Sequence, residues 1–244
     1  VAGKWLVTSE EGLDPPNVRG ENITVPFRHG SIWVQKYFEQ RTISLDMVVT
    51  GTTLADMKTN IDTLNGLFAL RTQQYLTYTP ESGTVTRRAY AEVMRNPYLR
   101  IEGPRYAKMQ VDFILTEPFF RLSTQTSVPI VVAASPQAGT VTHNGNAPEH
   151  SASIAMVGPL INPVITNANG AVLTYTGTIS AYGTVTVDCA AYTAVNQGGT
   201  SVLGNVSHSG AYQFMPFSPG ANVLSITSGT VGGTVTVSFY PPFI

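Results

Sequence analysis

The sequence predicts a mainly β protein of two domains, an α+β N-terminal domain and an all-β C-terminal sandwich. Three observations carry this prediction. All fourteen Lys and Arg residues of the 244-residue chain lie at or before Arg121. The segment that follows is dominated by Val, Thr and Ile, which favour strands. Residues 54–68 are the only stretch with a convincing amphipathic helix pattern.

Strand patterns dominate the N-terminal segment. In Arg41–Thr50 the apolar side chains of Ile43, Leu45, Met47 and Val49 fall on one face of a strand, opposite polar residues such as Asp46. Such alternation indicates a sheet with one buried face, which the helix would cover. Strands are expected at Lys4–Thr8, Ser31–Tyr37, Arg41–Thr50, Gln74–Thr79, Thr84–Met94 and Ala107–Leu115.

The predicted helix has apolar residues at three- and four-residue steps. Leu54, Met57, Ile61, Leu64 and Phe68 share one face, and Thr52 or Thr53 can cap its start. Burying each apolar side chain is worth about 1.5–3 kcal/mol, which exceeds the roughly 1 kcal/mol cost of Gly66 in the interior. The polar residues Asp56, Lys58, Asn60 and Asp62 are expected to face away.

Turn signals organise the rest of the chain. Pro80–Gly83 is typical of a hairpin turn that joins two of the predicted strands. The stretch Ser123–Pro129 is rich in Ser, Thr and Pro, as linkers are, so domains are expected at 1–122 and 128–244. In the second domain, period-two alternation and frequent Gly, Pro and Asn turns predict a β-sandwich or jelly roll.

Patterns that support catalysis or metal binding are missing from the sequence. The four histidines share no metal-ligand spacing, and the chain has no Gly-x-Ser-x-Gly and no Gly-x-Gly-x-x-Gly motif. The single cysteine, Cys189, is expected to be a small buried residue of a Val/Thr strand. The prediction is a non-enzymatic protein with no metal and no cofactor, although a new kind of hydrolase site stays open.

Charge and hydropathy argue against a membrane or nucleic-acid partner. The formal net charge is −1, and no apolar run approaches the roughly 18 residues of a spanning helix. The first residues show no signal-peptide pattern. Six basic residues with interleaved tyrosines lie between Arg87 and Lys108, which could grip a single strand. The favoured interpretation is that they are solvated strand edges or form salt bridges between subunits.

A carbohydrate-binding module is the alternative for the second domain. Tyr182, Tyr192 and Tyr212 could stack on sugar rings, but both tryptophans lie in the first segment and the second has no Lys or Arg after Arg121. Sugar sites usually combine an aromatic platform with charged or amide hydrogen-bonding groups. This reading is therefore the weaker one.

Three groups of motifs, spread in order over nearly the whole chain, resemble the distal tail protein family of siphophages. An Arg before an alternating ISL strand, a helix followed by a short strand and hairpin, and a late PG-x-N are typical of that family. The matching stretches are Val18–Gly20, Pro26–Gly30 and Gln40–Leu45; then Leu54–Leu70, Tyr75–Tyr78 and the strand with Arg87 and Arg88; and finally His143–Pro148, INPVITN at 161–167 and Phe217–Asn222.

The resemblance implies a structural virion protein at the distal end of a phage tail. It implies a tail-tube-like N-terminal domain that forms a ring of six and a galectin-like C-terminal sandwich, without the residues that galectins use for sugar. The expected partners are further copies in a homohexamer, the major tail tube protein, the tail-tip hub and the tape measure protein. DNA would meet the ring only in passing through the tail lumen.

The mixed charges of the first segment suit contacts between ring subunits by alternating charge pairing. The candidate contact residues are Arg41, Asp46, Arg87, Arg88, Tyr90 and Arg95.

Overall fold

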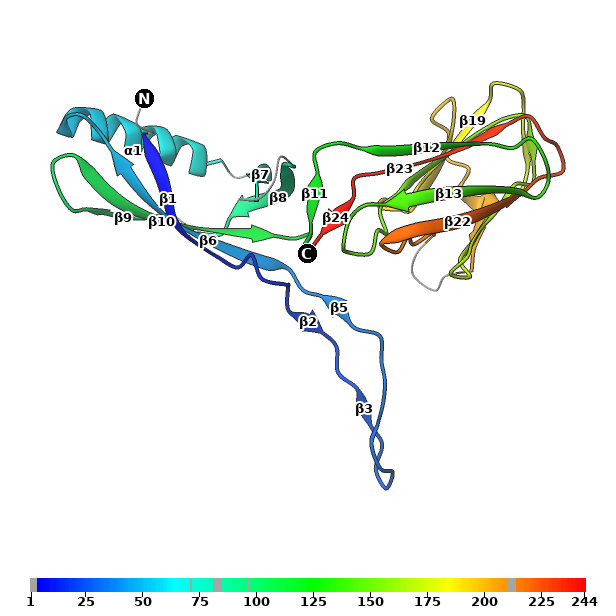
Figure 1. Cartoon of the computed structure of the whole chain (residues 1–244), viewed down its shortest axis with the longest axis horizontal. Coiled ribbons are helices and arrows are strands. Elements are labelled where there is room, and N and C mark those ends of the chain that lie inside the picture. Colours follow the sequence, from blue (N-terminus) through cyan, green and yellow to red (C-terminus); the bar gives the residue numbers. More distant parts are fainter. Residues whose placement is uncertain (1–3, 71, 81–84, 96, 210–213) are drawn as a thin grey trace. The chain divides into compact units, whose positions relative to one another are not determined.

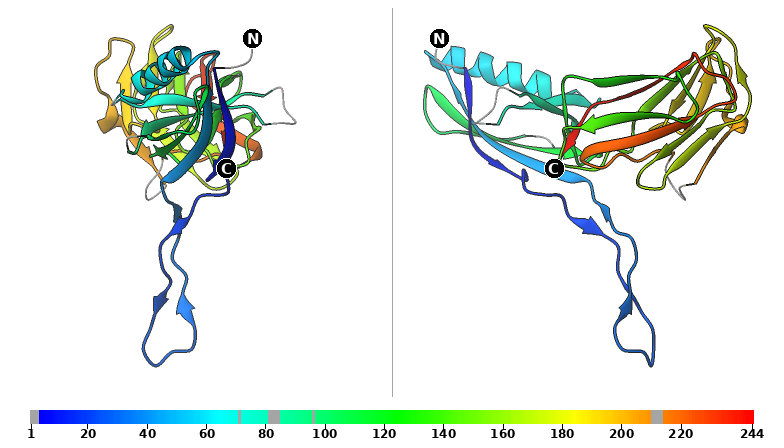
Figure 2. Two further views of the ribbon diagram at one scale, coloured as in Figure 1. Left: turned by 90° about the vertical axis from the view of Figure 1, so that its left-hand side faces the viewer. Right: turned by 45° about the vertical axis from the view of Figure 1, so that its right-hand side comes forward.

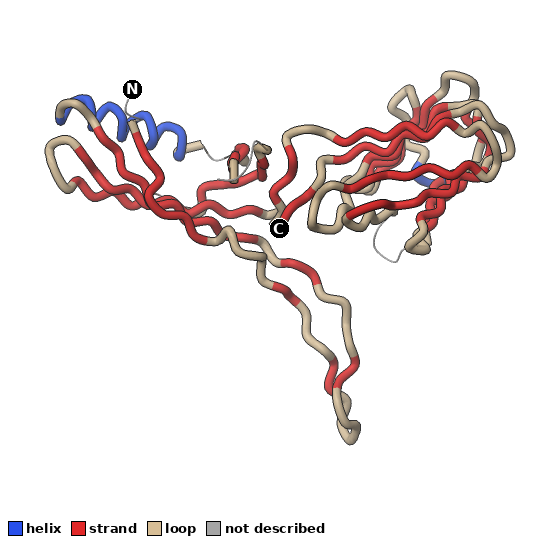
Figure 3. The backbone as a smooth tube through the Cα atoms, viewed as in Figure 1, coloured by secondary structure: helices blue, strands red, loops and turns tan. Residues whose placement is uncertain are grey.

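The computed structural model describes residues 4–70, 72–80, 85–95, 97–209 and 214–244. The chain divides into two compact units, Val1–Phe120 with Ile244 and Arg121–Phe243. Strands make up most of the regular structure of both units (Figure 3). This agrees with the mainly β fold expected from the sequence.

An antiparallel sheet forms the body of the first unit (Figure 1). Its strand order is β1-β6-β10-β8, with β7 paired to β8 and β9 paired to β10. The longest ladder joins β6 to β10 and runs from Arg41 opposite Leu115 to Thr50 opposite Tyr106. The strands are β1 (Trp5–Glu11), β6 (Arg41–Thr50), β7 (Gln74–Tyr78), β8 (Arg87–Val93), β9 (Tyr98–Ile101) and β10 (Tyr106–Leu115).

Between β1 and β6 the chain forms an arm of two short strand pairs. The pairs are β2 (Val18–Arg19) with β5 (Tyr37–Phe38), and β3 (Ile23–Thr24) with β4 (Ser31–Ile32). The arm leaves the sheet on the side away from the helix (Figure 2). A single strand over Ser31–Tyr37 was a wrong prediction, because a two-stranded ribbon without a third strand or a core holds its pairing only locally.

The helix α1 (Leu54–Phe68) lies where the apolar periodicity predicted it. Thr53 caps the start, since its side-chain oxygen accepts a hydrogen bond from the Asp56 N–H at 3.1 Å. Met57, Ile61 and Leu64 are buried. They pack against sheet residues that share one face of β6 and β10, namely Met47, Val49, Ala107, Met109 and Val111.

Two residues of α1 differ from the expected pattern. Leu54, predicted to be buried, is 45% exposed. Asn60, predicted to face solvent, is buried, and its Nδ2 donates to the Thr50 carbonyl at 2.8 Å. This amide satisfies a backbone acceptor at the end of β6, which a periodicity argument cannot detect.

Two five-stranded sheets form a sandwich in the second unit. One has the order β12-β23-β14-β19-β20, with β12 (Thr126–Val131), β23 (Thr234–Phe239), β14 (Ser153–Val157), β19 (Thr184–Asp188) and β20 (Thr193–Asn196). The other has the order β13-β22-β16-β17-β21, with β13 (Gln137–His143), β22 (Gly220–Thr227), β16 (Val164–Asn167), β17 (Val172–Tyr175) and β21 (Val206–His208).

Short elements complete the second unit. β15 (Leu160–Ile161) pairs with β18 (Thr178–Ile179), and η1 (Leu203–Asn205) is a single 3-10 turn before β21. β11 (Phe120–Leu122), where the chain passes into the second unit, pairs with β24 (Pro242–Phe243).

Alternation along the strands fills the core of the sandwich. Val185 and Val187 of β19 and Val235 and Val237 of β23 point inward, as the Thr-Val repeats predicted. The predicted linker Ser123–Pro129 is wrong over its second half, because β12 begins at Thr126. β12 is the edge strand of its sheet, where a proline that lacks an N–H is tolerated.

The hairpin expected at Pro80–Gly83 is tested only in part. Residues 81–83 lie outside the described residues, but β7 and β8 on either side pair antiparallel, from Gln74 opposite Ala91 to Tyr78 opposite Arg87.

Candidate functional site

The described part of the chain has no group of three or more His, Cys, Asp or Glu residues that could hold a metal ion. Its helices are also too short and too polar to cross a membrane. Cys189 is 2% exposed, and burial raises the pKa of its thiol to about 12. The thiol is therefore protonated and inert at neutral pH. The candidate functional features are surfaces.

The arm is the first of these surfaces, and apolar side chains are exposed along it. Ile23, Phe27, Ile32 and Trp33 all lie open to solvent, and Trp33 is 72% exposed. Large apolar side chains gathered on an isolated ribbon are a marker of a protein contact.

The tip of the arm is a tight turn. The Arg28 N–H donates to the Val25 carbonyl at 3.3 Å, and Phe27 has a φ of 61°. Proline at the second position and positive φ at the third is the pattern of a type II turn, where glycine is usual. Here a phenylalanine takes that position, and its side chain is fully exposed.

The second surface is an aromatic stack on β7 and β8. The rings of Tyr75 and Tyr90 stack with their centroids 4.3 Å apart, and the two hydroxyl groups share a hydrogen bond of 2.5 Å. The Arg88 guanidinium lies over the Tyr75 ring, 4.5 Å from its centroid. The hydrogen bond between the two tyrosine hydroxyl groups raises the pKa of Tyr75. Arg88 and Tyr90, both predicted contact residues, thus form one exposed group together with Tyr75.

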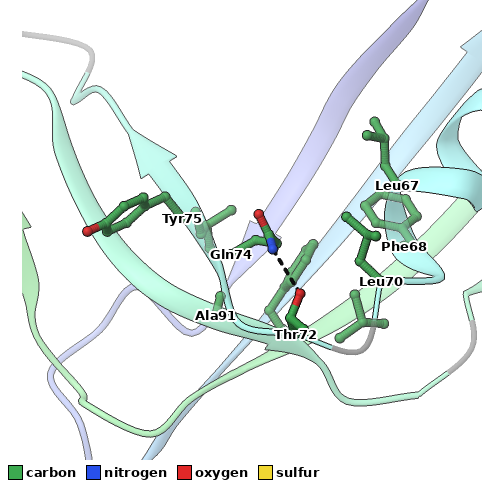
Figure 4. Close-up of a pocket in the computed structure, with 10 residues that line it drawn as sticks. Leu67, Phe68, Leu70, Thr72, Gln74, Tyr75 and Ala91 are labelled. Carbon is green, nitrogen blue, oxygen red and sulfur yellow. Dashed lines mark hydrogen bonds between the residues drawn. The ribbon is translucent and has the colours of Figure 1, made fainter.

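Beside this stack lies an apolar cavity of about 280 Å³ (Figure 4). Side chains from the end of α1 form one side of it, and side chains of β7 and β8 form the other. Leu67, Leu70 and Tyr75 at its rim are each about half exposed. The lining also includes Phe68, Thr72, Gln74, Leu76, Ala91, Val93 and Phe113.

Asp46 lies on a third surface, the polar face of the sheet. It is exposed, stands opposite Gln110 of β10, and lines a shallow groove with Tyr98 and Arg100. Glu102 in the same groove pairs with Lys108 at 3.2 Å and with Arg100 at 3.6 Å. The groove therefore carries balanced charges.

Ion pairs within the chain neutralise much of the basic stretch. Arg95, another predicted contact residue, pairs with Asp112 at 2.5 Å, and Arg100 and Lys108 share Glu102. A surface for single-stranded nucleic acid needs cations that are available to phosphates. These three pairs form within one chain, so the expectation of salt bridges between subunits stays a prediction.

The remaining candidates, Arg41 and Arg87, lie apart from these surfaces. Arg41, at the start of β6, is 4% exposed and its guanidinium lies 5.8 Å from the centre of the Phe120 ring. Burial lowers the pKa of Arg41, while the charge of Asp14 raises it. Arg87 is partly buried on β8, opposite Tyr78. The structure therefore does not bring the six candidates together at one site.

In the second unit, several polar side chains hold turns. Asn222 Nδ2 donates to the Ser218 carbonyl at 2.8 Å, and the Gly145 N–H donates to His143 Nδ1 at 2.8 Å. Tyr182 and Tyr192, candidates for sugar stacking, are 88% and 48% exposed, and Tyr212 lies outside the described residues.

Sequence reasoning missed the arm tip, the cavity and Tyr75. Pro26 is a local turn signal, because proline favours the second position of a turn. The exposure of Phe27 has no such signal, because it depends on how the arm lies relative to the rest of the first unit. The cavity forms between elements that are distant along the chain and has no local signature.

Comparisons with known proteins agree with this fold. Residues 3–114 match the model of the phage tail protein RIFT-related domain. None of the curated proteins matches the chain. Among solved structures, the Dit protein of phage SPP1, described as a paradigm of the hub adsorption apparatus in phages that infect Gram-positive bacteria, is similar with a TM-score of 0.73. The two are 16% identical over 99% of this chain and 94% of that one. A chain of the phage p2 baseplate is more distant, with a TM-score of 0.43 and 10% identity over 98% of this chain and 91% of that one.

Proposed function

We propose that the chain is a structural protein of the distal end of a phage tail, because residues 3–114 match the model of the phage tail protein RIFT-related domain and the whole chain has a fold similar to that of the SPP1 Dit protein. In this role it joins the tail tube to the tail-tip or baseplate proteins and carries no catalytic activity. Its partners are the major tail tube protein, the tail-tip hub and the tape measure protein.

The observation that carries the proposal is the apolar arm of the first unit. A monomer gains nothing from exposed Ile23, Ile32 and Trp33 on an isolated ribbon, because each apolar side chain left in water forgoes roughly 1.5–3 kcal/mol. An arm that packs on a neighbouring subunit recovers this free energy. Contacts of this head-to-tail kind close into a ring when the rotation between subunits allows it.

We propose six copies in that ring, with Asp46, Arg88 and Tyr90 at contacts between subunits or with the tube. The aromatic stack and the polar groove lie on different strands, so one subunit offers two separate surfaces for such contacts. The sandwich of the second unit serves protein contacts rather than sugar binding, because its sequence has no Trp for a stacking platform and no Lys or Arg after Arg121.

Two measurements test the proposal. Sedimentation equilibrium of the purified chain should give the mass of six copies, and a strict monomer at micromolar concentration would contradict ring formation. Electron microscopy of particles that carry a tag on this chain should show the label at the distal end of the tail. Label on the capsid or along the whole tube would contradict the proposed position.

A further inference from the structure

The first unit carries both an apolar cavity and, at the end of its arm, an exposed apolar side chain. On the basis of the proposed ring, we propose that Phe27 of one copy inserts into the cavity between α1 and β7–β8 of the next copy. The cavity is thus the docking site for the arm tip of a second copy of this chain.

The backbone of the tip presents Phe27 outward. A positive φ of 61° costs conformational energy for a residue with a Cβ, and a glycine at this turn position would avoid that cost. Such strain persists where it serves a contact. The Phe27 side chain is fully exposed, so no described residue of its own chain covers its aromatic ring.

The cavity matches an aromatic side chain in chemistry and in volume. Apolar groups dominate its lining, with Phe68 and Phe113 in edge-to-face contact, 5.9 Å between centroids, at one wall. Leu67 and Leu70 lie at the helix side of the rim and Tyr75 lies at the strand side (Figure 4). Its volume of about 280 Å³ leaves room for one inserted ring.

Charge at the rim complements the tip. The last turn of α1 contains no basic residue, and its terminal carbonyls carry partial negative charge. Arg28 follows Phe27 directly, and a guanidinium next to these carbonyls is the favourable arrangement at a helix C-terminus. Arg88 lies over Tyr75 at the strand side of the rim, which directs Arg28 towards the helix side.

The occupant must come from another copy. The arm leaves the sheet on the side away from α1, so the tip cannot reach the cavity of its own chain (Figure 2). The tip and the cavity are different surfaces of one subunit. Their contact is therefore head-to-tail, as a closed ring requires.

Disulfide cross-linking of the full-length chain tests the docking directly. Arg28→Cys combined with Leu67→Cys keeps Phe27 in place, and it should form disulfides between copies under mild oxidation and give a ladder of multimers in denaturing gels. Cys189 does not interfere, because it is buried and its thiol is protonated. The control pairs Arg28→Cys with Val223→Cys, whose 49% exposure matches the 53% of Leu67, and should give no ladder.

A second pair of variants separates docking from folding. Phe27→Gly relieves the backbone strain and should leave the melting temperature unchanged or higher, while it weakens assembly about tenfold to a hundredfold. Phe27→Leu should retain most of the assembly. Mixing Phe27→Gly with Leu67→Glu chains should give dimers and no closed rings, because each pair has only one intact contact.

Four outcomes would overturn the inference. One is a cross-link within a single copy, and another is an equal ladder from the control pair. The third is a wild-type oligomer that Phe27→Gly does not weaken, which would reject this docking site and leave the proposed ring intact. A wild-type chain that never assembles would reject the docking and the ring together.

Discussion

Arg121 donates from Nη1 to Glu149 Oε2 across 2.5 Å, and Glu149 is completely buried. The last basic residue of the chain thus neutralises one of the two acids of the second unit. Arg121 also donates from Nη2 to Ser151 Oγ at 2.7 Å and from Nη1 to the Tyr240 carbonyl at 2.8 Å. A sandwich almost free of charged residues therefore contains a buried ion pair.

Removing one partner of this pair should destabilise the second unit strongly. Arg121→Met leaves the Glu149 carboxylate buried without its cation, and we expect the free energy of unfolding to fall by about 3–5 kcal/mol. Calorimetry of the full chain measures the change. Arg121→Met with Glu149→Gln should recover most of the loss, because the amide oxygen still accepts the hydrogen bond from the Ser151 N–H. Equal losses in the single and double variants would contradict this explanation.

The second unit should lose stability as the pH falls from 7.5 to 5.5. Burial lowers the pKa of His143 and His150 below 6.5, although the charge of Glu149 acts in the opposite direction. The unfolded chain therefore binds protons more readily, so stability is complete above 6.5 and is lost as the pH falls through that value towards the folded pKa. The slope is at most about 1.4 kcal/mol per pH unit for each histidine.

Melting temperatures at a series of pH values check this dependence. His143→Asn should reduce the slope, and His143→Asn with His150→Asn should remove it. A flat curve for the wild-type chain would show that the buried imidazoles do not couple to folding.

Cys189 should resist thiol reagents in the folded protein. A thiol that is 2% exposed with a pKa of about 12 supplies almost no thiolate at pH 8. Mass spectrometry after treatment with a maleimide should find unmodified chain in buffer and complete modification in denaturant. Rapid labelling of the native chain would mean that the sandwich opens at Cys189.

Two glycines of the first unit should respond in opposite ways to alanine. A Cβ at Gly51 would lie 2.3 Å from the Met57 backbone nitrogen, so Gly51→Ala should destabilise the unit by about 1–3 kcal/mol. A Cβ at Gly66 meets only open space, and Gly66→Ala should stabilise the helix by roughly 1 kcal/mol.

Tryptophan fluorescence during denaturant unfolding measures both variants. Trp5 and Trp33 both lie in the first unit, so the signal reports that unit alone. A Gly51→Ala variant as stable as the wild type would show that α1 shifts freely against the end of β6.

Local patterns predicted much of the fold correctly. Thr-Val alternation located β19 and β23, and the spacing of Met57, Ile61 and Leu64 located α1, because period and burial are properties of neighbouring residues. The same logic failed at Asn60 and at Ser31–Tyr37. Asn60 is buried because its side chain donates to a carbonyl of β6. Ser31–Tyr37 does not form one continuous strand because the arm has no third strand to pair with it.

The sequence pointed to charged and aromatic residues as candidates for subunit contacts, but it did not predict which of them lie together in the fold. Arg88 and Tyr90 lie on the same face of β8 because they are two residues apart on one strand. Their partner Tyr75 lies on β7, and the register between β7 and β8 places it opposite Tyr90. Arg41 follows the pattern of an exposed strand start and is buried, because Phe120 covers it. The exposure of a charged residue depends on segments that are distant in the sequence.

The sequence by itself determined the strand-rich composition, the position of the helix and the change in charge at Arg121, since these follow from residue types and their local spacing. Only the tertiary structure decided that Arg121 meets Glu149, that Phe27 stands free at the end of an arm and that a cavity opens beside α1. Each of these depends on which distant segments pack together, and that choice is a property of the whole fold.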